Sequence, residues 1–201
     1  MILNDRILSD YIRQGKIINA EKSKLGQDLI LSQVNPNSVD LTLDQRYFQS
    51  PWWVRNDPLF NYPPAELEAT DYKRSWIPRD ARNDPYNSGI IIEPGHSILA
   101  GTREWISMPD DCCGQLFTKS SLGRMFINHM MAGVIDAGFE GRLTLEFKNE
   151  GRHRIRLAFG SRVVQLIVTR LIEPAEHPYG SRETSRYQNA KYVETAKVEK
   201  N

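Results

Sequence analysis

Short runs in which apolar and polar residues alternate occupy much of the chain, and this period of two is typical of β-strands. Residues 38–43 place three aliphatic side chains on one face and three polar side chains on the other, which predicts a half-buried strand after the turn at 35–37. Further strands are predicted at 90–92, 97–102, 105–108, 114–118, 130–135, 143–147, 155–157 and 163–169. Short strands separated by turn residues indicate a sandwich or barrel, so the predicted fold class is mainly β.

Three segments depart from this pattern. Residues 4–14 carry apolar side chains at helical spacing, with Asn4 or Asp5 able to cap the helix and Gly15 able to end it. Residues 50–88 hold six prolines among aromatic residues, and we interpret them as an ordered, irregular insertion, the alternative being a flexible loop. Residues 175–201 form a polar C-terminal tail that we expect to order when a ligand binds. We therefore expect a single domain over 1–201.

Composition limits the classes of partner and compartment. Lys and Arg number 26 and Asp and Glu 25, so the chain lacks the basic footprint of a nucleic-acid-binding protein. Cys112 and Cys113 are adjacent, which excludes a disulfide framework and a C-x-x-C zinc site and fits a cytoplasmic location. No secretory signal is recognisable, and no run approaches 18 apolar residues, so we expect no membrane partner.

The candidate chemistry centres on Glu146. In the predicted strand 143–147, Leu143, Leu145 and Phe147 face the core, while Thr144 and Glu146 point the other way. A glutamate on an outer strand face is usually solvated. If another subunit covers this face, burial raises the carboxyl pKa, and the group becomes able to take and give protons near neutral pH.

Two neighbouring segments could serve a phosphorylated ligand. Asp136 stands where the 130–135 strand ends, and it either organises the turn by accepting backbone N–H groups or takes part in chemistry. Gly138 and Gly141 supply backbone conformations that a Cβ would resist. The segment 119–124, K-S-S-L-G-R, offers hydroxyl and cationic donors of the kind that bind phosphate.

Other polar segments are interpreted as structural. Residues 152–156 alternate basic side chains around Ile155, which suits an exposed edge strand that resists pairing with another chain. We expect His129 to be structural, because the sequence gives it no partner, and the Trp52–Trp53 pair to be buried packing.

Several of these strings together resemble the dCTP deaminase family, whose members are related to trimeric dUTP diphosphatases. Residues 119–124 resemble [RK]-S-S-L-[AG]-R, and 129–136, H-M-M-A-G-V-I-D, resemble H-x-[ST]-A-G-x-I-D. Residues 137–146 continue into x-G-F-x-G-x-x-T-L-E, and 37–41, N-S-V-D-L, resemble S-S-[IV]-D-[LV]. Downstream, 176–181 match E-H-P-Y-G-S and 186–188, R-Y-Q, resemble the following S-K-Y-Q. The resemblance covers residues 1 to about 188, with 50–88 as the divergent part.

The resemblance implies a distorted, dUTPase-like β-barrel or jelly roll that forms a homotrimer with active sites between subunits. It implies hydrolytic deamination of dCTP to dUTP, or onward to dUMP, with Glu146 as the general base. Ser120 and the backbone of Ala132 would position the water, Arg124 would support the charge of the site, and Asp136 would hold the deoxyribose. The full set of substrate-binding residues that it implies is Lys119, Ser120, Ser121, Arg124, Asp136, Thr144, Leu145, Gln165, Tyr179 and Arg186.

The resemblance also implies that Mg²⁺ binds through the substrate phosphates, with no metal ligand from protein side chains. Zinc is not expected, because neither H-x-E nor P-C-x-x-C, the zinc deaminase signature, occurs in the sequence. Met131, Val134, Arg186 and Ala190 depart from the family pattern, and no G-P-T-x-S-R string follows. Two alternatives therefore stay open: a dUTP diphosphatase in which Asp136 activates water, and a nucleotide-binding trimer that has lost turnover.

Overall fold

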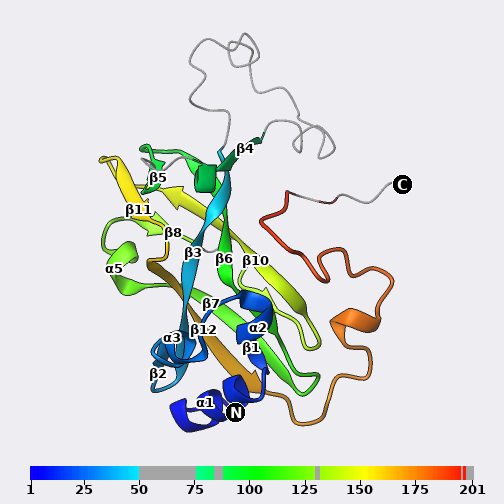
Figure 1. The fold of residues 1–201 in the computed structure, drawn as a ribbon. Coiled ribbons are helices and arrows are strands. Elements are labelled where there is room, and N and C mark those ends of the chain that lie inside the picture. The colour runs from blue at the N-terminus through cyan, green and yellow to red at the C-terminus, as the bar shows by residue number, and fades with distance from the viewer. Residues whose placement is uncertain (50–75, 84–87, 130–131, 196, 198–201) are drawn as a thin grey trace.

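The computed structural model describes residues 1–49, 76–83, 88–129, 132–195 and 197. Within them, a curled ten-stranded sheet forms a half-barrel, and a separate two-stranded sheet lies at one end (Figure 1). The main path runs β8-β10-β6-β3-β12-β7-β9, with β1, β2 and β4 paired to it at its margins, and β11 pairs with β5. This confirms the mainly β prediction.

The strands have the following bounds: β1 Ile17–Asn19, β2 Val34–Asn35, β3 Ser38–Gln49, β4 Ile77–Asp80, β5 Gly89–Ile92, β6 Ser97–Ser107, β7 Cys112–Thr118, β8 Ile127–Asn128, β9 Val134–Ile135, β10 Glu140–Asn149, β11 Ile155–Ala158 and β12 Arg162–Arg170. The helices are α1 Asp5–Arg13, α2 Ala20–Ser23, α3 Gln27–Leu31 and α5 Ser120–Gly123, with 3₁₀ turns η4 Ala81–Asn83 and η5 Tyr179–Ser181.

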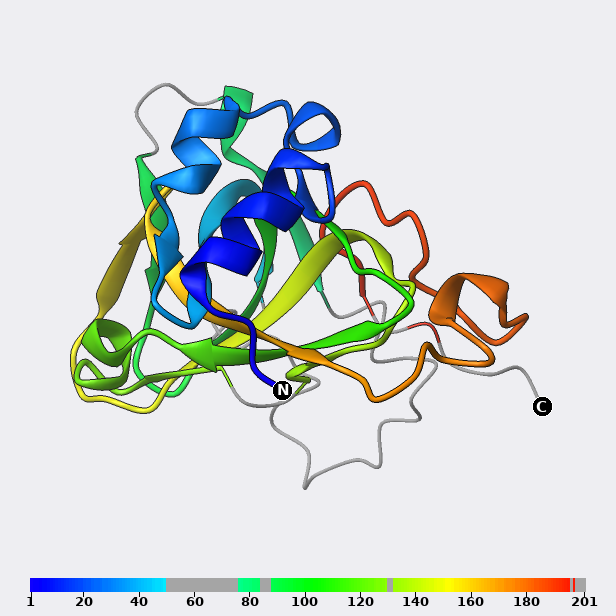
Figure 2. The same cartoon turned by 90° about the horizontal axis from the view of Figure 1, so that it is seen from below.

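The N-terminal helix α1 forms as its sequence predicts. The Asn4 side chain accepts a hydrogen bond from the N–H of Ile7 and caps the helix. Leu8 and Ile12 are fully buried, and Gly15 follows the helix at φ +72°. α1 lies across the sheet beside α3 (Figure 2). The apolar face of α1 therefore packs the N-terminal segment onto the core.

The strands of the core are longer and more buried than predicted. β6 runs without a break through Glu104, whose fully buried carboxylate accepts hydrogen bonds from Thr42 and Gln33. The polar face of β3 is also covered, since Asp40 is 1% exposed and Ser38 and Thr42 are buried. The half-buried prediction for 38–43 is therefore wrong, because side chains from distant elements satisfy these polar groups.

Three other predictions are corrected or fall outside the described residues. Residues 50–75 and 84–87 are not described, so the Trp52–Trp53 prediction lies outside the described residues. The segment 50–88, expected to be irregular, does contain a strand, β4, which pairs with β3. Of the predicted strand 130–135, residues 130–131 are not described and only Val134–Ile135 form a strand. In 152–156, only the last two residues belong to a strand, β11, although the basic side chains before it are exposed as expected.

The described part of the C-terminal tail packs along β10, on the right in Figure 1. The N–H of Asn189 donates to the carbonyl of Glu140 at 2.7 Å, and the N–H of Arg142 donates to that of Ala190 at 2.8 Å. The tail therefore extends the sheet at the edge where the candidate carboxylate lies. No helix among the described residues is both long and apolar enough to cross a membrane.

Candidate active site

β10 presents Glu146 on the face away from the core. Leu143, Leu145 and Phe147 are buried, while Thr144 and Glu146 are half-buried on the opposite face, as the alternation predicts. Leu145, a predicted substrate-binding residue, is fully buried and does not line the cavity described next. Strand pairing with β6 fixes the register of β10, in which Glu146 lies opposite Leu99.

A cavity of about 350 Å³ opens beside Glu146. Its volume suits a small-molecule ligand. Three of the predicted site residues line it: Ala132, Thr144 and Glu146. The other lining residues are mostly apolar or belong to the tail: Trp76, Leu99, Leu116, Val134, Ile135, Phe139, Arg142, Leu143, Tyr187, Ala190, Glu194 and Thr195.

Burial changes the acidity of Glu146. Its side chain keeps only 23% of its exposure, and this desolvation raises the pKa from 4.5 to about 7. The backbone N–H groups of Glu146 itself and of Ala132 favour the carboxylate and oppose part of the shift. A single chain thus supplies most of the cover that the sequence led us to expect from a neighbouring subunit.

His129 lies next to this carboxyl group. The residue is 1% exposed, and its Nδ1 is 3.7 Å from Oε2 of Glu146. Burial lowers the pKa of His129, and the backbone of Glu146 opposes the shift. His129 is buried, as a structural residue would be, but it does have a partner, which the sequence could not indicate because 17 positions separate the two residues.

Asp136 directly follows β9 and begins the glycine-containing turn. Its side chain is 53% exposed and pairs with Arg182 at 3.3 Å. Gly138 has φ +77°, and a Cβ there would lie 2.6 Å from Cβ of Pro178. The turn therefore needs glycine both for its conformation and for the close approach of the tail. Arg182 is a candidate site residue that sequence reasoning missed, although it directly follows the E-H-P-Y-G-S string.

The tail occupies the rim of the cavity. The Thr144 hydroxyl accepts a hydrogen bond from the N–H of Glu194 at 3.0 Å. The ring of Tyr179 packs edge-on against Phe139, with 5.5 Å between centroids, and its hydroxyl accepts from the N–H of Tyr187. Thr144 is thus engaged by the tail, and Tyr179 is held within it. The tail also contributes lining residues that the sequence did not suggest.

Arg186 lies in the same tail without lining the cavity. Its guanidinium donates to the carbonyl of Lys197 at 2.5 Å, and Nζ of Lys197 donates to the carbonyl of Arg186 at 2.7 Å. The two residues hold the end of the described tail as a closed loop. The predicted phosphate-binding cation is therefore positioned by the tail itself.

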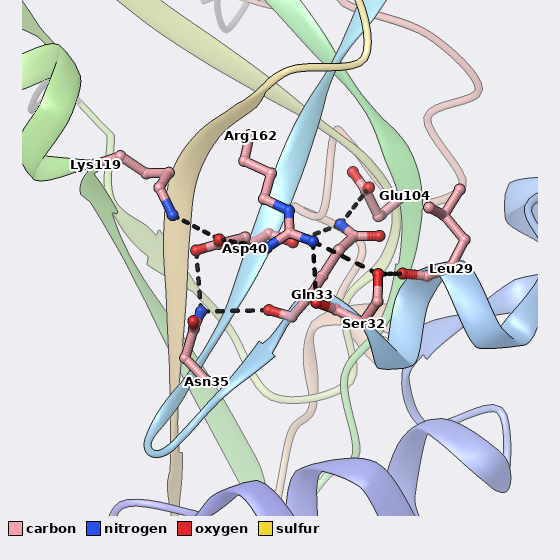
Figure 3. Close-up of polar contacts among 8 residues, drawn as sticks. All are labelled: Leu29, Ser32, Gln33, Asn35, Asp40, Glu104, Lys119 and Arg162. Atoms are coloured by element: carbon pink, nitrogen blue, oxygen red, sulfur yellow. Dashed lines mark hydrogen bonds and ion pairs between the residues drawn. The ribbon is translucent and has the colours of Figure 1, made fainter.

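Lys119 is held by a buried carboxylate (Figure 3). Its Nζ lies 2.5 Å from Oδ2 of Asp40, which also receives the Asn35 amide at 3.1 Å on its other oxygen. Arg162 approaches Oδ2 of Asp40 at 3.5 Å from the more exposed side. Asp40, on β3, thereby ties α5 and β12 together and fixes the position of Lys119.

The remaining predicted residues do not line the Glu146 cavity. Ser120 and Ser121 are exposed on α5, and Arg124 lines a separate cavity of about 430 Å³ with 125–126, 150–153 and 155. Gln165 is half-buried on β12, between β3 and β7. α5 and the tail lie on opposite sides of the molecule in both views (Figures 1 and 2). One chain therefore divides the predicted site residues into two groups.

In the described ranges, no group of three or more His, Cys, Asp or Glu side chains is arranged to hold a metal ion.

A family model described as dCTP deaminase-like matches residues 2–171. The chain belongs to the dCTP deaminase-like family. A protein of Streptomyces coelicolor named dCTP deaminase, dUMP-forming, is 42% identical over 78% of this chain and 78% of its own length. A protein of Methanobrevibacter smithii with the same name is 34% identical over 98% and 93%.

A solved structure supports the same fold for this dCTP deaminase-like chain. The crystal structure of 2′-deoxycytidine 5′-triphosphate deaminase from Agrobacterium tumefaciens matches with a TM-score of 0.59 and 25% identity. The match covers 83% of this chain and 47% of the other, so the chain spans about half the length of that protein. The predicted dUTPase-like fold class is thus confirmed.

Proposed function

We propose that this chain catalyses the hydrolytic deamination of dCTP. Membership of the dCTP deaminase-like family and the names of its relatives support the substrate. The observation that carries the proposal is Glu146, a mostly buried carboxyl with a pKa of about 7 on the wall of a ligand-sized cavity. Such a group exchanges protons readily at neutral pH.

Glu146 acts as the general base. Its carboxylate takes a proton from a water molecule as the oxygen of that water bonds to C4 of cytosine, and the same proton passes to N3. A proton then moves from the hydroxyl on C4 to the departing nitrogen, the C4–N bond breaks, and ammonia and the uracil nucleotide leave. The backbone at Ala132, whose N–H acts on Glu146, holds the water from one side. Placement and proton transfer together supply the rate acceleration.

The complete site is shared between subunits of a homotrimer. Ala132 and Glu146 line one cavity while Arg124 lines another, and Ser120 lines neither. We infer that Ser120 and Arg124 of one subunit meet the Glu146 cavity of the next. Ser120 then completes the positioning of the water, and Arg124 adds positive charge to the site.

The triphosphate is held by cations rather than by a protein-bound metal. Lys119, fixed by Asp40, and Arg186, fixed by the tail, supply point and forked donors respectively. Mg²⁺ carried on the phosphate oxygens of the substrate would reduce their charge, with no ligand from a protein side chain.

The product is dUMP, with dUTP as the intermediate. The names of the relatives from Streptomyces and Methanobrevibacter support this. Asp136 is exposed, so it can activate a second water that attacks the α-phosphate of dUTP and displaces pyrophosphate, and Arg182 beside it can hold the phosphate. This step is the reaction of the alternative dUTP diphosphatase.

Chromatography of reactions with dCTP, dUTP and CTP tests the proposal. We expect dCTP to give ammonia, dUMP and pyrophosphate, with CTP untouched. Formation of dUMP from dUTP, with no deamination of dCTP, would select the diphosphatase. Tight dCTP binding by calorimetry without any product would select a catalytically inactive nucleotide-binding protein.

A further inference from the structure

His129 is a buried ionisable residue that the proposed reaction does not yet use. Its backbone N–H donates to the hydroxyl of Thr118 at 3.0 Å, and this hydroxyl lies 3.4 Å from the backbone carbonyl of His129. Its ring lies 5.4 Å from the Phe147 ring, between centroids. Thr118 ends β7 and Phe147 lies in β10, so β7 holds the backbone of His129 while β10 packs against its imidazole ring.

The polar atoms of this ring face an equally unsatisfied partner. Within the described residues, neither ring nitrogen has a hydrogen bond of ordinary length, and neither does Oε2 of Glu146. Leaving such buried atoms unpaired costs free energy. Nδ1 and Oε2 are 3.7 Å apart, and a movement of roughly half an ångström to one ångström brings them to hydrogen-bond length.

The other ionisable groups nearby are occupied elsewhere or do not line the cavity. Arg142 donates to the backbone carbonyl of Thr102, and Glu194 pairs with Lys197. The remaining candidates are the Tyr187 hydroxyl, which accepts from the N–H of Lys197, and Lys148, which is half-buried on the same face of β10. His129 is therefore the ionisable side chain placed to act on the buried oxygen of Glu146.

We propose that His129 is a positioning residue whose neutral imidazole donates its Nδ1–H to Oε2 of Glu146 and leaves Oε1 to meet the attacking water. The inference rests on the proposed role of Glu146. His129 neither gains nor loses a proton during turnover, because the proton of the water goes to Oε1. A donor to the charged carboxylate also favours the base form of Glu146.

Substitutions at 129 separate this role from packing. His129→Leu fills the site without a donor, whereas His129→Asn keeps an N–H on the atom bonded to Cγ, where Nδ1 stands in histidine. We expect the Leu variant to lose about 10- to 100-fold in kcat/KM. The acidic limb of its pH profile should move up by about one pH unit. The Asn variant should recover most of both. His96→Leu, at a partly exposed histidine outside the cavity, is the matched control and should behave as the wild type.

Equal activity and pH profile in the Leu variant and the wild type, or equal defects in the Leu and Asn variants, would overturn the proposal. If the Leu variant does not fold, the comparison becomes Asn with Gln, because Gln carries its amide one carbon farther and should not restore activity.

¹⁵N NMR of the histidine rings tests the contact without turnover. The Nδ1–H tautomer of His129 is expected, and the Nε2–H tautomer would refute the contact. A wild type that fails to deaminate dCTP but has the Nδ1–H tautomer would refute the proposed function alone.

Discussion

The proton affinity of Glu146 is set by residues of its own chain. Burial raises its pKa from 4.5 to about 7, so folding favours the protonated acid over the carboxylate. The stabilising effect of the bound proton is complete below pH 4.5 and is lost as the pH rises through about 7. Above pH 7 the protein therefore keeps Glu146 as a carboxylate at the expense of stability.

Glu146→Gln should remove this loss of stability at high pH, because glutamine carries no charge to bury. The difference in unfolding free energy between the variant and the wild type should grow by about 3 kcal/mol in favour of the variant from pH 4 to pH 9. Urea unfolding at several pH values measures it. A difference that does not change with pH would show that the carboxyl is not desolvated in the folded protein.

Asp40 performs the opposite task, holding cations in place. Asp40→Asn should leave Lys119 without its anionic partner and lower the unfolding free energy by about 3 kcal/mol. It should also raise KM for dCTP, because Lys119 is no longer fixed. Arg162→Leu is the control, since it removes the longer, more exposed contact with Asp40 at 3.5 Å and the hydrogen bond to the Ser32 carbonyl but leaves the Lys119 pair intact. Equal effects of both substitutions on KM would contradict the assigned role of Asp40.

At the scale of elements, the turn between β9 and β10 joins the carboxylates to the tail. Gly138→Ala should lower the unfolding free energy by about 1–3 kcal/mol, because φ is +77° and the new Cβ would collide with Pro178. It should also weaken substrate binding by displacing the tail near Asp136. Gly123→Ala in α5, where a Cβ meets nothing within 4 Å, should be neutral or slightly stabilising. Thermal melts that fail to separate the two variants would count against this account of the turn.

The elements also show what a sequence can reveal. The alternation around Leu143 and Phe147 depends on local pleating, so β10 and the outward direction of Glu146 could be predicted. The continuity of β6 could not, because Glu104 looks like an interruption until Thr42 and Gln33, more than 60 positions earlier, are placed beside it. The contact of His129 with Glu146 and the tail contact on Thr144 are likewise nonlocal, and no periodicity encodes them.

At the scale of the whole molecule, the predicted site residues lie in two separate groups, and we expect subunits to associate so that the two groups meet. Inactive Ser120→Ala and Glu146→Gln chains, unfolded and refolded together, should form mixed trimers. In these, the Ser120 of one chain meets the Glu146 of another, and part of the activity should return. Each variant refolded alone is the control. If every site lies within one chain, the mixture will stay as inactive as its components.

The claim on which the mechanism depends is that Glu146 is the base, poised near neutral pH by burial. The pH dependence of kcat/KM for dCTP deamination tests it most directly, since this parameter reports ionisations of the free enzyme. We predict an acidic limb near pH 7 in the wild type, and at least ~10²-fold loss of activity at all pH values in folded Glu146→Gln. An acidic limb near pH 4.5, or appreciable turnover by the Gln variant, would contradict it.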